Sequence, residues 1–141
     1  MWLNEGFATY GTYLWEELGN DKNIDEVIAD DLTLRFSGAP ELLGFAPATP
    51  DPTERGIFAP HVYYRGALVV HAMRRELGDE RFFQFLKSYF NEFQDSNIST
   101  PKFLEFTKSQ TDANLDQVFD TWLFGEELPE SLGDLDLSDF G

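Results

Sequence analysis

Apolar residues recur at three- and four-residue spacing along most of the chain, which predicts helices separated by short breaks. In the first segment, for example, Phe7, Tyr10, Leu14 and Leu18 fall on one helical face. Helices are predicted over residues 2–19, 22–36, 60–77, 79–94, 100–111 and 114–125. No segment has a convincing strand pattern. The pattern therefore predicts an all-α protein, a helical bundle.

The breaks between these segments carry residues that stop or start helices. Gly78 ends one predicted helix, and Asp79 and Asn114 are candidate caps for the next ones. Residues 37–56 are crowded with Gly and Pro, which predicts a long loop. After Pro129, Leu and Asp alternate with Gly and Ser. We expect a helical subdomain over residues 1–129 and an acidic mobile tail over residues 130–141.

Composition and charge narrow the class of protein. Of 141 residues, 42% are hydrophobic and 14 are Phe, which supports a packed core. The net charge of −16 argues against binding to nucleic acid or to an anionic membrane surface. The absence of Cys excludes disulfides, thiol nucleophiles and cysteine metal sites. No apolar stretch approaches the roughly 18 residues of a membrane helix, and no signal peptide is evident at the start.

Glu5 is the first candidate functional residue. It lies in Trp2-Leu3-Asn4-Glu5-Gly6-Phe7-Ala8, in the first turn of a predicted helix and among apolar neighbours. Burying a carboxylate is costly unless a cation or hydrogen bonds compensate. An acid in the first turn of a helix is also common without any function, because the helix macrodipole stabilises it. Glu5 is thus either a carboxylate that a cation or hydrogen bonds compensate or a helix-end acid.

A pair of tyrosines, Tyr63 and Tyr64, opens the third predicted helix and is followed by Arg65 and Gly66. A phenol stays a neutral hydrogen-bond donor at neutral pH, so it can stabilise an oxyanion. Two aromatic residues at this position can equally well pack into a helical core. The spacing alone leaves both interpretations open.

These segments together resemble the aminopeptidase N family of zinc aminopeptidases. Residues 2–8 are similar to the family segment whose Glu is the third zinc ligand, and this resemblance implies that role for Glu5. Tyr63 matches the family tyrosine that donates a hydrogen bond to the oxyanion of the tetrahedral intermediate. A weaker match covers Trp122 to Pro129. The resemblance implies the helical C-terminal subdomain of a thermolysin-like metallopeptidase catalytic domain.

The chain lacks the family's His-Glu-x-x-His motif. Its only histidines, His61 and His71, are ten positions apart and not the i, i+4 pair that binds zinc from one helix face. His61 is a candidate for lining a subsite, and His71 is expected to be a packed histidine. The segment that reads the substrate's free amine, Gly-x-Met-Glu-Asn, is also absent. We therefore expect zinc to bind the parent protein but not this fragment, which should be inactive alone.

The resemblance implies a parent enzyme that removes N-terminal residues from peptides, although the family also hosts epoxide-hydrolase-like chemistry. Its expected partners are peptide substrates and the N-terminal half of its own catalytic domain. The fragment alone is expected to self-associate or to be marginally stable, with Trp2, Phe7 and Tyr10 exposed. The alternative is a non-catalytic acidic helical interaction module with a sticky face of Trp2, Tyr13 and Trp15.

Overall fold

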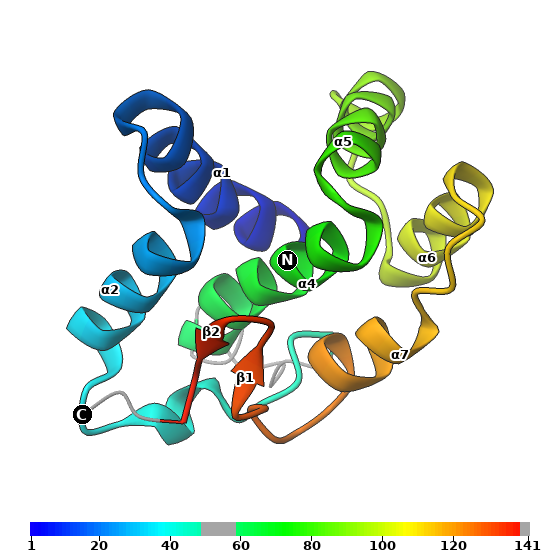
Figure 1. Cartoon of the computed structure of the whole chain (residues 1–141). Helices are drawn as coiled ribbons and strands as arrows, with labels where there is room; N and C mark the ends of the chain where they lie inside the picture. Colours follow the sequence, from blue (N-terminus) through cyan, green and yellow to red (C-terminus); the bar gives the residue numbers. More distant parts are fainter. Residues whose placement is uncertain (49–58, 139–141) are drawn as a thin grey trace.

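The computed structural model describes residues 1–48 and 59–138 and confirms the helical prediction (Figure 1). Two helices come first, followed by a short 3-10 turn; after the undescribed residues, a π-helical turn runs directly into the central helix. These elements are α1 (Trp2–Asn20), α2 (Ile24–Phe36), η1 (Pro40–Leu43), η2 (His61–Arg65) and α4 (Gly66–Leu77). The rest are α5 (Asp79–Phe93), α6 (Thr100–Gln110), α7 (Asp116–Val118), the π-helical turn η3 (Phe119–Leu123) and two short strands, β1 (Ser131–Leu132) and β2 (Leu135–Asp136).

The side chains at the helix starts show a local cap, and they correct two predicted ones. Asn23 caps α2 by accepting from the backbone N–H groups of Asp25 and Glu26. Asn114 lies one residue before the cap position of α7, which Leu115 holds, and its side-chain oxygen accepts from the Asp116 N–H at 3.0 Å. Asp79 does not cap α5, where Gly78 holds that position. Its carboxylate is instead drawn to the buried guanidinium of Arg74, at 2.9 Å.

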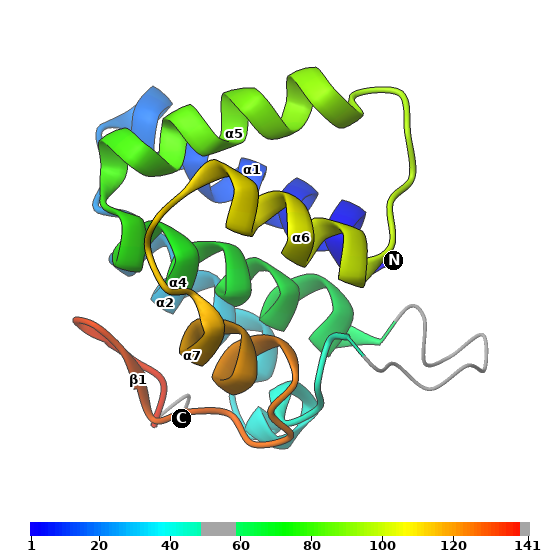
Figure 2. The same cartoon turned by 90° about the vertical axis from the view of Figure 1, so that its right-hand side faces the viewer.

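Helix α4 is the centre of the fold. α1 and α2 lie on one side of it, and α5 and α6 lie on the other (Figures 1 and 2). Most of its side chains are buried, because neighbours cover it on several sides. Among the described residues, no helix combines the length and the apolar character needed to cross a membrane.

An aromatic cluster joins α1 to α5 and α6. Phe7 stacks on Tyr89 with ring centroids 4.9 Å apart, and Phe103 meets Tyr89 edge-on at 5.6 Å. The Trp2 indole N–H donates to the Thr100 hydroxyl at 2.9 Å, which fixes the start of α1 beside the start of α6 (Figure 2). This cluster provides the large apolar surface that the Phe-rich composition predicted.

The expectation that Trp2, Phe7 and Tyr10 would be exposed is wrong. All three are buried, with exposures of 3%, 9% and 1%, and Tyr13 is buried as well. They point into the chain's own core, towards α4, α5 and α6. Trp15, at 73% exposed, is the member of the expected apolar face that remains at the surface.

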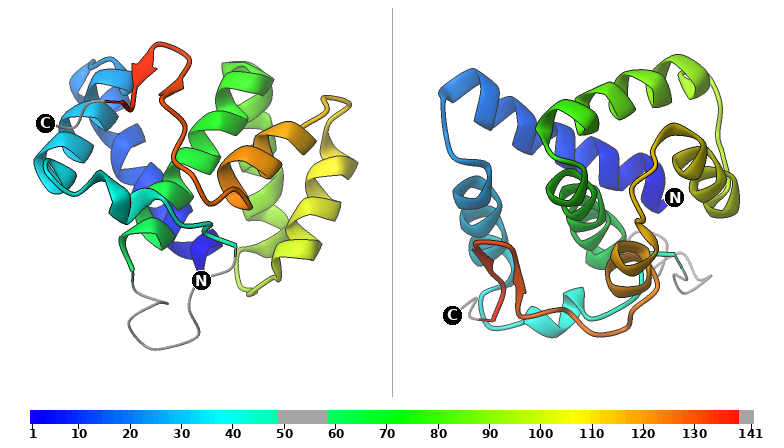
Figure 3. Two further views of the ribbon diagram at one scale, coloured as in Figure 1. Left: turned by 90° about the horizontal axis from the view of Figure 1, so that it is seen from below. Right: turned by 45° about the vertical axis from the view of Figure 1, so that its right-hand side comes forward.

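Residues 131–138 differ from the expected mobile tail. β1 and β2 pair antiparallel, with Leu132 opposite Leu135, and the hairpin lies beside α2 (Figure 3). Leu132, Leu135 and Leu137 are buried, while the intervening acids face solvent. The alternation of Leu and Asp was therefore a short strand pattern with one buried face. Residues 139–141 of the expected tail, and residues 49–56 of the expected loop, lie outside the described residues.

Candidate active site

The candidate site lies where the first turns of α1 meet η2 and the start of α4. Gly6 and Gly66 bring the two backbones into contact there. A Cβ atom built on Gly6 would lie 2.8 Å from the Gly66 carbonyl carbon, closer than real Cβ contacts. One built on Gly66 would lie 3.1 Å from the Gly6 Cα. The two glycines therefore permit an approach that any side chain would prevent, and the first turns of α1, which carry Glu5, lie against η2, which carries Tyr63.

Glu5 lies on the first turn of α1, as the sequence predicted. Its backbone N–H donates to the Met1 carbonyl at 3.1 Å, and its side chain is half-buried. Within residues 1–48 and 59–138, no side chain forms a hydrogen bond or an ion pair with its carboxylate. The carboxylate is thus available to a ligand from outside this part of the chain.

Tyr63 lies on η2, shortly before Gly66. In this turn the Gly66 N–H donates to the His61 carbonyl, five residues back, instead of the usual four. Burial raises the pKa of the Tyr63 hydroxyl, and the nearby Glu5 carboxylate raises it further. Tyr63 is therefore a neutral phenol at neutral pH and can donate a hydrogen bond beside Glu5.

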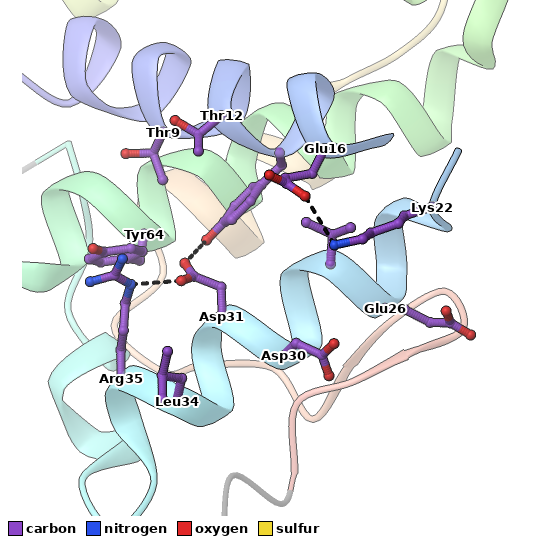
Figure 4. Close-up of a pocket in the computed structure, with 12 residues that line it drawn as sticks. Thr9, Thr12, Glu16, Lys22, Glu26, Asp30, Asp31, Leu34, Arg35 and Tyr64 are labelled. Carbon is purple, nitrogen blue, oxygen red and sulfur yellow. Dashed lines mark hydrogen bonds and ion pairs between the residues drawn. The ribbon is translucent and has the colours of Figure 1, made fainter. Parts of the chain in front are cut away.

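Tyr64 is directed to a different surface. Its ring packs edge-on against Phe36 with centroids 5.1 Å apart, and the Arg35 guanidinium lies over its face at 5.1 Å. These contacts place it in a groove of about 680 Å³ between α1 and α2 (Figure 4). The ring of Tyr64 thus lies in this groove, whereas Tyr63 does not line it.

On α1 the groove is lined by residues between Thr9 and Glu16. Figure 4 shows Thr9, Thr12 and Glu16 on this helix, opposite the acids of α2. Four of its charged groups form two ion pairs within the groove. Asp31 accepts from the Tyr13 hydroxyl and from Arg35, each at 2.8 Å, and Lys22 contacts Glu16 at 3.0 Å.

Neither histidine has Glu5 among its bonding partners. His71 is buried in α4, with one ring nitrogen 2.8 Å from the Tyr10 hydroxyl and the other 2.8 Å from Asp25. Burial lowers its pKa, so the neutral ring donates to Asp25 and accepts from Tyr10. His71 is therefore a packed histidine, as expected. His61 is also buried, with its ring 5.5 Å from that of Phe45, and burial lowers its pKa.

Sequence reasoning missed the polar network around Tyr10. Besides His71, the Tyr10 hydroxyl meets Arg74 at 3.5 Å, and Arg74 forms two bonds to Glu17 at 2.8 and 2.9 Å. Burial raises the pKa of Tyr10 well above its ordinary value. The spacing of Arg74 and His71 on one helix offered a signal, but their partners lie on α1 and α2.

The described residues do not form a metal site by themselves. Among them, no three His, Cys, Asp or Glu side chains gather in a way that could hold a metal ion. A catalytic zinc needs three protein ligands. Glu5 is one candidate ligand, and the other two would have to come from outside this chain.

Comparison with known proteins identifies the family of this chain. Residues 1–122 match the Peptidase family M1 domain. The chain belongs to peptidase family M1. Two curated family M1 relatives are similar over most of it. Aminopeptidase N of Lactococcus lactis subsp. lactis is 25% identical over 87% of the chain, and Aminopeptidase M1-B of Oryza sativa subsp. japonica is 29% identical over 96%.

Solved structures of family M1 share the fold. The M1 zinc metallopeptidase from Deinococcus radiodurans superposes with a TM-score of 0.72 at 35% identity, covering 93% of this chain. A variant of that enzyme bound to a Tyr-Ser-Ala substrate gives 0.73 at 37% identity, with the same coverage. This chain spans 15% and 16% of the curated relatives and 28% of those solved chains. It thus corresponds to one part of a family M1 protein, and the fold agrees with the helical part.

Proposed function

We propose that this chain forms the helical part of the catalytic domain of a zinc aminopeptidase, in which Glu5 is a zinc ligand and Tyr63 is a catalytic hydrogen-bond donor. The observation that supports the proposal is the contact between Gly6 and Gly66, which brings the turn of α1 that carries Glu5 against the turn that carries Tyr63. Glu5 and Tyr63 are 58 positions apart in the sequence (63 − 5), yet the elements that carry them are in contact.

The chemistry of each residue suits its proposed role. Glu5 would complete a ligand set with two imidazoles from outside the chain, and bound zinc polarises a carbonyl and lowers the pKa of water. Tyr63 would donate to the oxygen that becomes negative when the scissile carbonyl is attacked. Its raised pKa keeps the proton on the phenol in the working pH range. The substrate would be the N-terminal residue of a peptide.

The outer face of α1 offers a contact surface for the rest of the catalytic domain. Ala8, Gly11, Trp15 and Leu18 are exposed along one stripe, and Trp15 and Leu18 are 73% and 70% exposed. We propose that the N-terminal half of the catalytic domain covers this stripe, and that the isolated chain self-associates through it. Sedimentation of the isolated chain would contradict this if it remained monomeric at all concentrations.

The alternative of a non-catalytic interaction module is weakened, because most of its proposed contact residues are not at the surface. Of its three proposed sticky residues, Trp2 and Tyr13 are buried, and Trp15 alone is exposed. The discriminating observation is the sequence that precedes Trp2 in the longer polypeptide. A helix carrying His-Glu-x-x-His there supports the peptidase, and a longer polypeptide without that motif supports the module.

The test compares variants of the longer, zinc-loaded protein. Glu5→Ala should reduce zinc content. Tyr63→Phe should retain zinc and lower kcat by roughly 100-fold, the effect of losing one oxyanion donor. Tyr64→Phe is the matched control, because its ring lies in the groove between α1 and α2. Full kcat in Tyr63→Phe would refute the role of Tyr63. The isolated chain should bind zinc only weakly and hydrolyse no aminoacyl substrate.

A further inference from the structure

Arg65 is a buried charged residue for which the proposed chemistry has no direct use. It lies on η2, two residues after Tyr63, and its exposure is 0%. Burying a guanidinium is expensive unless its donors are satisfied and its charge is compensated. No carboxylate approaches it among the described residues; the charged group instead contacts backbone.

Four carbonyl oxygens from two distant segments surround the guanidinium. Nε donates to Trp122 at 3.1 Å, and Nη1 donates to Leu43 at 3.1 Å. Nη2 donates to Thr121 at 2.9 Å and to Gly125 at 2.6 Å. Four of the five N–H donors of the side chain are therefore used. The planar guanidinium thus links η2 to the end of η1, to the last turn of η3 and to Gly125 beyond it.

The electrostatic compensation comes from helix ends. Thr121 and Trp122 belong to the last turn of η3, where carbonyls lack intrahelical partners and carry partial negative charge. The Leu123 carbonyl is satisfied separately, by the Ala48 N–H at 3.2 Å. Burial still lowers the pKa of Arg65 to about 10, so the side chain remains a cation at neutral pH.

The position of the Tyr63 ring is tied to the backbone that Arg65 holds. Its hydroxyl forms no hydrogen bond to another described residue, so the position of the ring is set by packing and by the backbone of η2. That backbone is held on one side by the contact between Gly6 and Gly66. On the other side the four bonds of Arg65 hold it.

We propose that Arg65 is a positioning residue, which fixes η2 so that Tyr63 is presented beside Glu5. The inference rests on the proposed function of Tyr63. It assigns to the segment around Trp122 and Gly125 the role of an acceptor frame for this arginine. Lysine cannot replace the arginine, because three donors on a single nitrogen cannot reach four carbonyls arranged around a plane.

The first experiment is a double-mutant cycle in the longer, zinc-loaded protein. Arg65→Lys should lower kcat at least roughly tenfold, the cost of a small misplacement, while zinc content and KM stay unchanged. In the Tyr63→Phe background, Arg65→Lys should cause no further loss. An equal loss in both backgrounds, or no loss in either, would overturn the positioning role.

The matched control is Arg74→Lys. Arg74 is also buried, with 6% exposure, but its partners are the carboxylates of Glu17 and Asp79. It should destabilise the fold and leave kcat unchanged. If Arg65→Lys does not fold, Gly125→Ala tests the same frame from the acceptor side, because a Cβ there would press on the Thr121 carbonyl. It should lower kcat in the wild-type background only; a loss in the Tyr63→Phe background as well would count against the proposal.

A second readout needs no activity and separates this inference from the proposed function. The ring of Tyr63 can be followed in the chain itself by nuclear magnetic resonance with isotope-labelled tyrosines, its signals assigned with Tyr63→Phe. Arg65→Lys should shift the ring signals of Tyr63, because η2 loses its bonds to Leu43 and to the end of η3, and Arg74→Lys should leave them in place. Unshifted Tyr63 signals in Arg65→Lys would refute the positioning role even if Tyr63 proves catalytic. Shifted signals would support it even if Tyr63→Phe retained full kcat.

Discussion

The contact between Gly6 and Gly66 makes the sharpest prediction about stability. In Gly6→Ala, the new Cβ would lie 2.8 and 2.9 Å from the carbonyl carbon and oxygen of Gly66. These are backbone atoms, so neither can move aside as the end of a flexible side chain would. Gly11, in the same helix, is the matched control, because a Cβ there meets nothing within 4 Å.

The expected magnitudes have opposite signs. Replacing Gly by Ala within a helix stabilises it by about 1 kcal/mol, and Gly11→Ala should show this gain. Overpacking costs about 1–3 kcal/mol, and an obstacle made of backbone favours the upper end. Gly6→Ala should therefore destabilise the chain by about 2 kcal/mol after the gain in helix propensity is included.

Urea unfolding followed by far-ultraviolet circular dichroism measures both variants against the unsubstituted chain. The slope of the free energy against urea should stay constant, so that the midpoints report stability alone. Gly6→Ala should also lower the Tyr63 pKa, because separating α1 from η2 moves Tyr63 away from Glu5. If Gly6→Ala is as stable as Gly11→Ala, the two backbones do not touch, and the geometry of the site is wrong.

Two further predictions concern other buried groups. Burial lowers the pKa of His71 and of His61 below 6.5, so the unfolded chain binds more protons as the pH falls. Their contribution to stability is fully present above pH 6.5 and is lost as the pH drops through the lowered pKa values. Urea midpoints measured over a pH series should fall with pH in this range, and they should fall less steeply in His71→Phe. An unaltered pH dependence of the midpoint in His71→Phe would contradict the prediction. Leu135→Ala should cost about 2–5 kcal/mol because Leu135 is buried in the hairpin, whereas Leu34→Ala, at 82% exposure, should change stability by less than about 0.5 kcal/mol. Equal effects in that pair would mean that the hairpin does not pack on the core.

Local signals in the sequence were enough to place the helices and to single out the two site candidates. Helical periodicity and the Gly and Pro positions located each helix to within a few residues, because these signals depend only on neighbouring residues. The stretch around Glu5 and the stretch from Tyr63 to Gly66 were specific enough on their own to indicate the aminopeptidase family. The zinc-ligand and donor roles of these residues remain proposals.

The direction in which the first helix faces, and the way η2 is held, depended on the packing of the whole chain. The apolar stripe of α1 predicted a buried face but not its partner, and Trp2, Phe7 and Tyr10 pack on α4, α5 and α6. The acceptors of Arg65 are backbone carbonyls, which every residue has, so no sequence pattern marks them. The close contact of Gly6 with Gly66 likewise depends on how two helices cross, and the crossing is fixed by side chains distributed over the whole core.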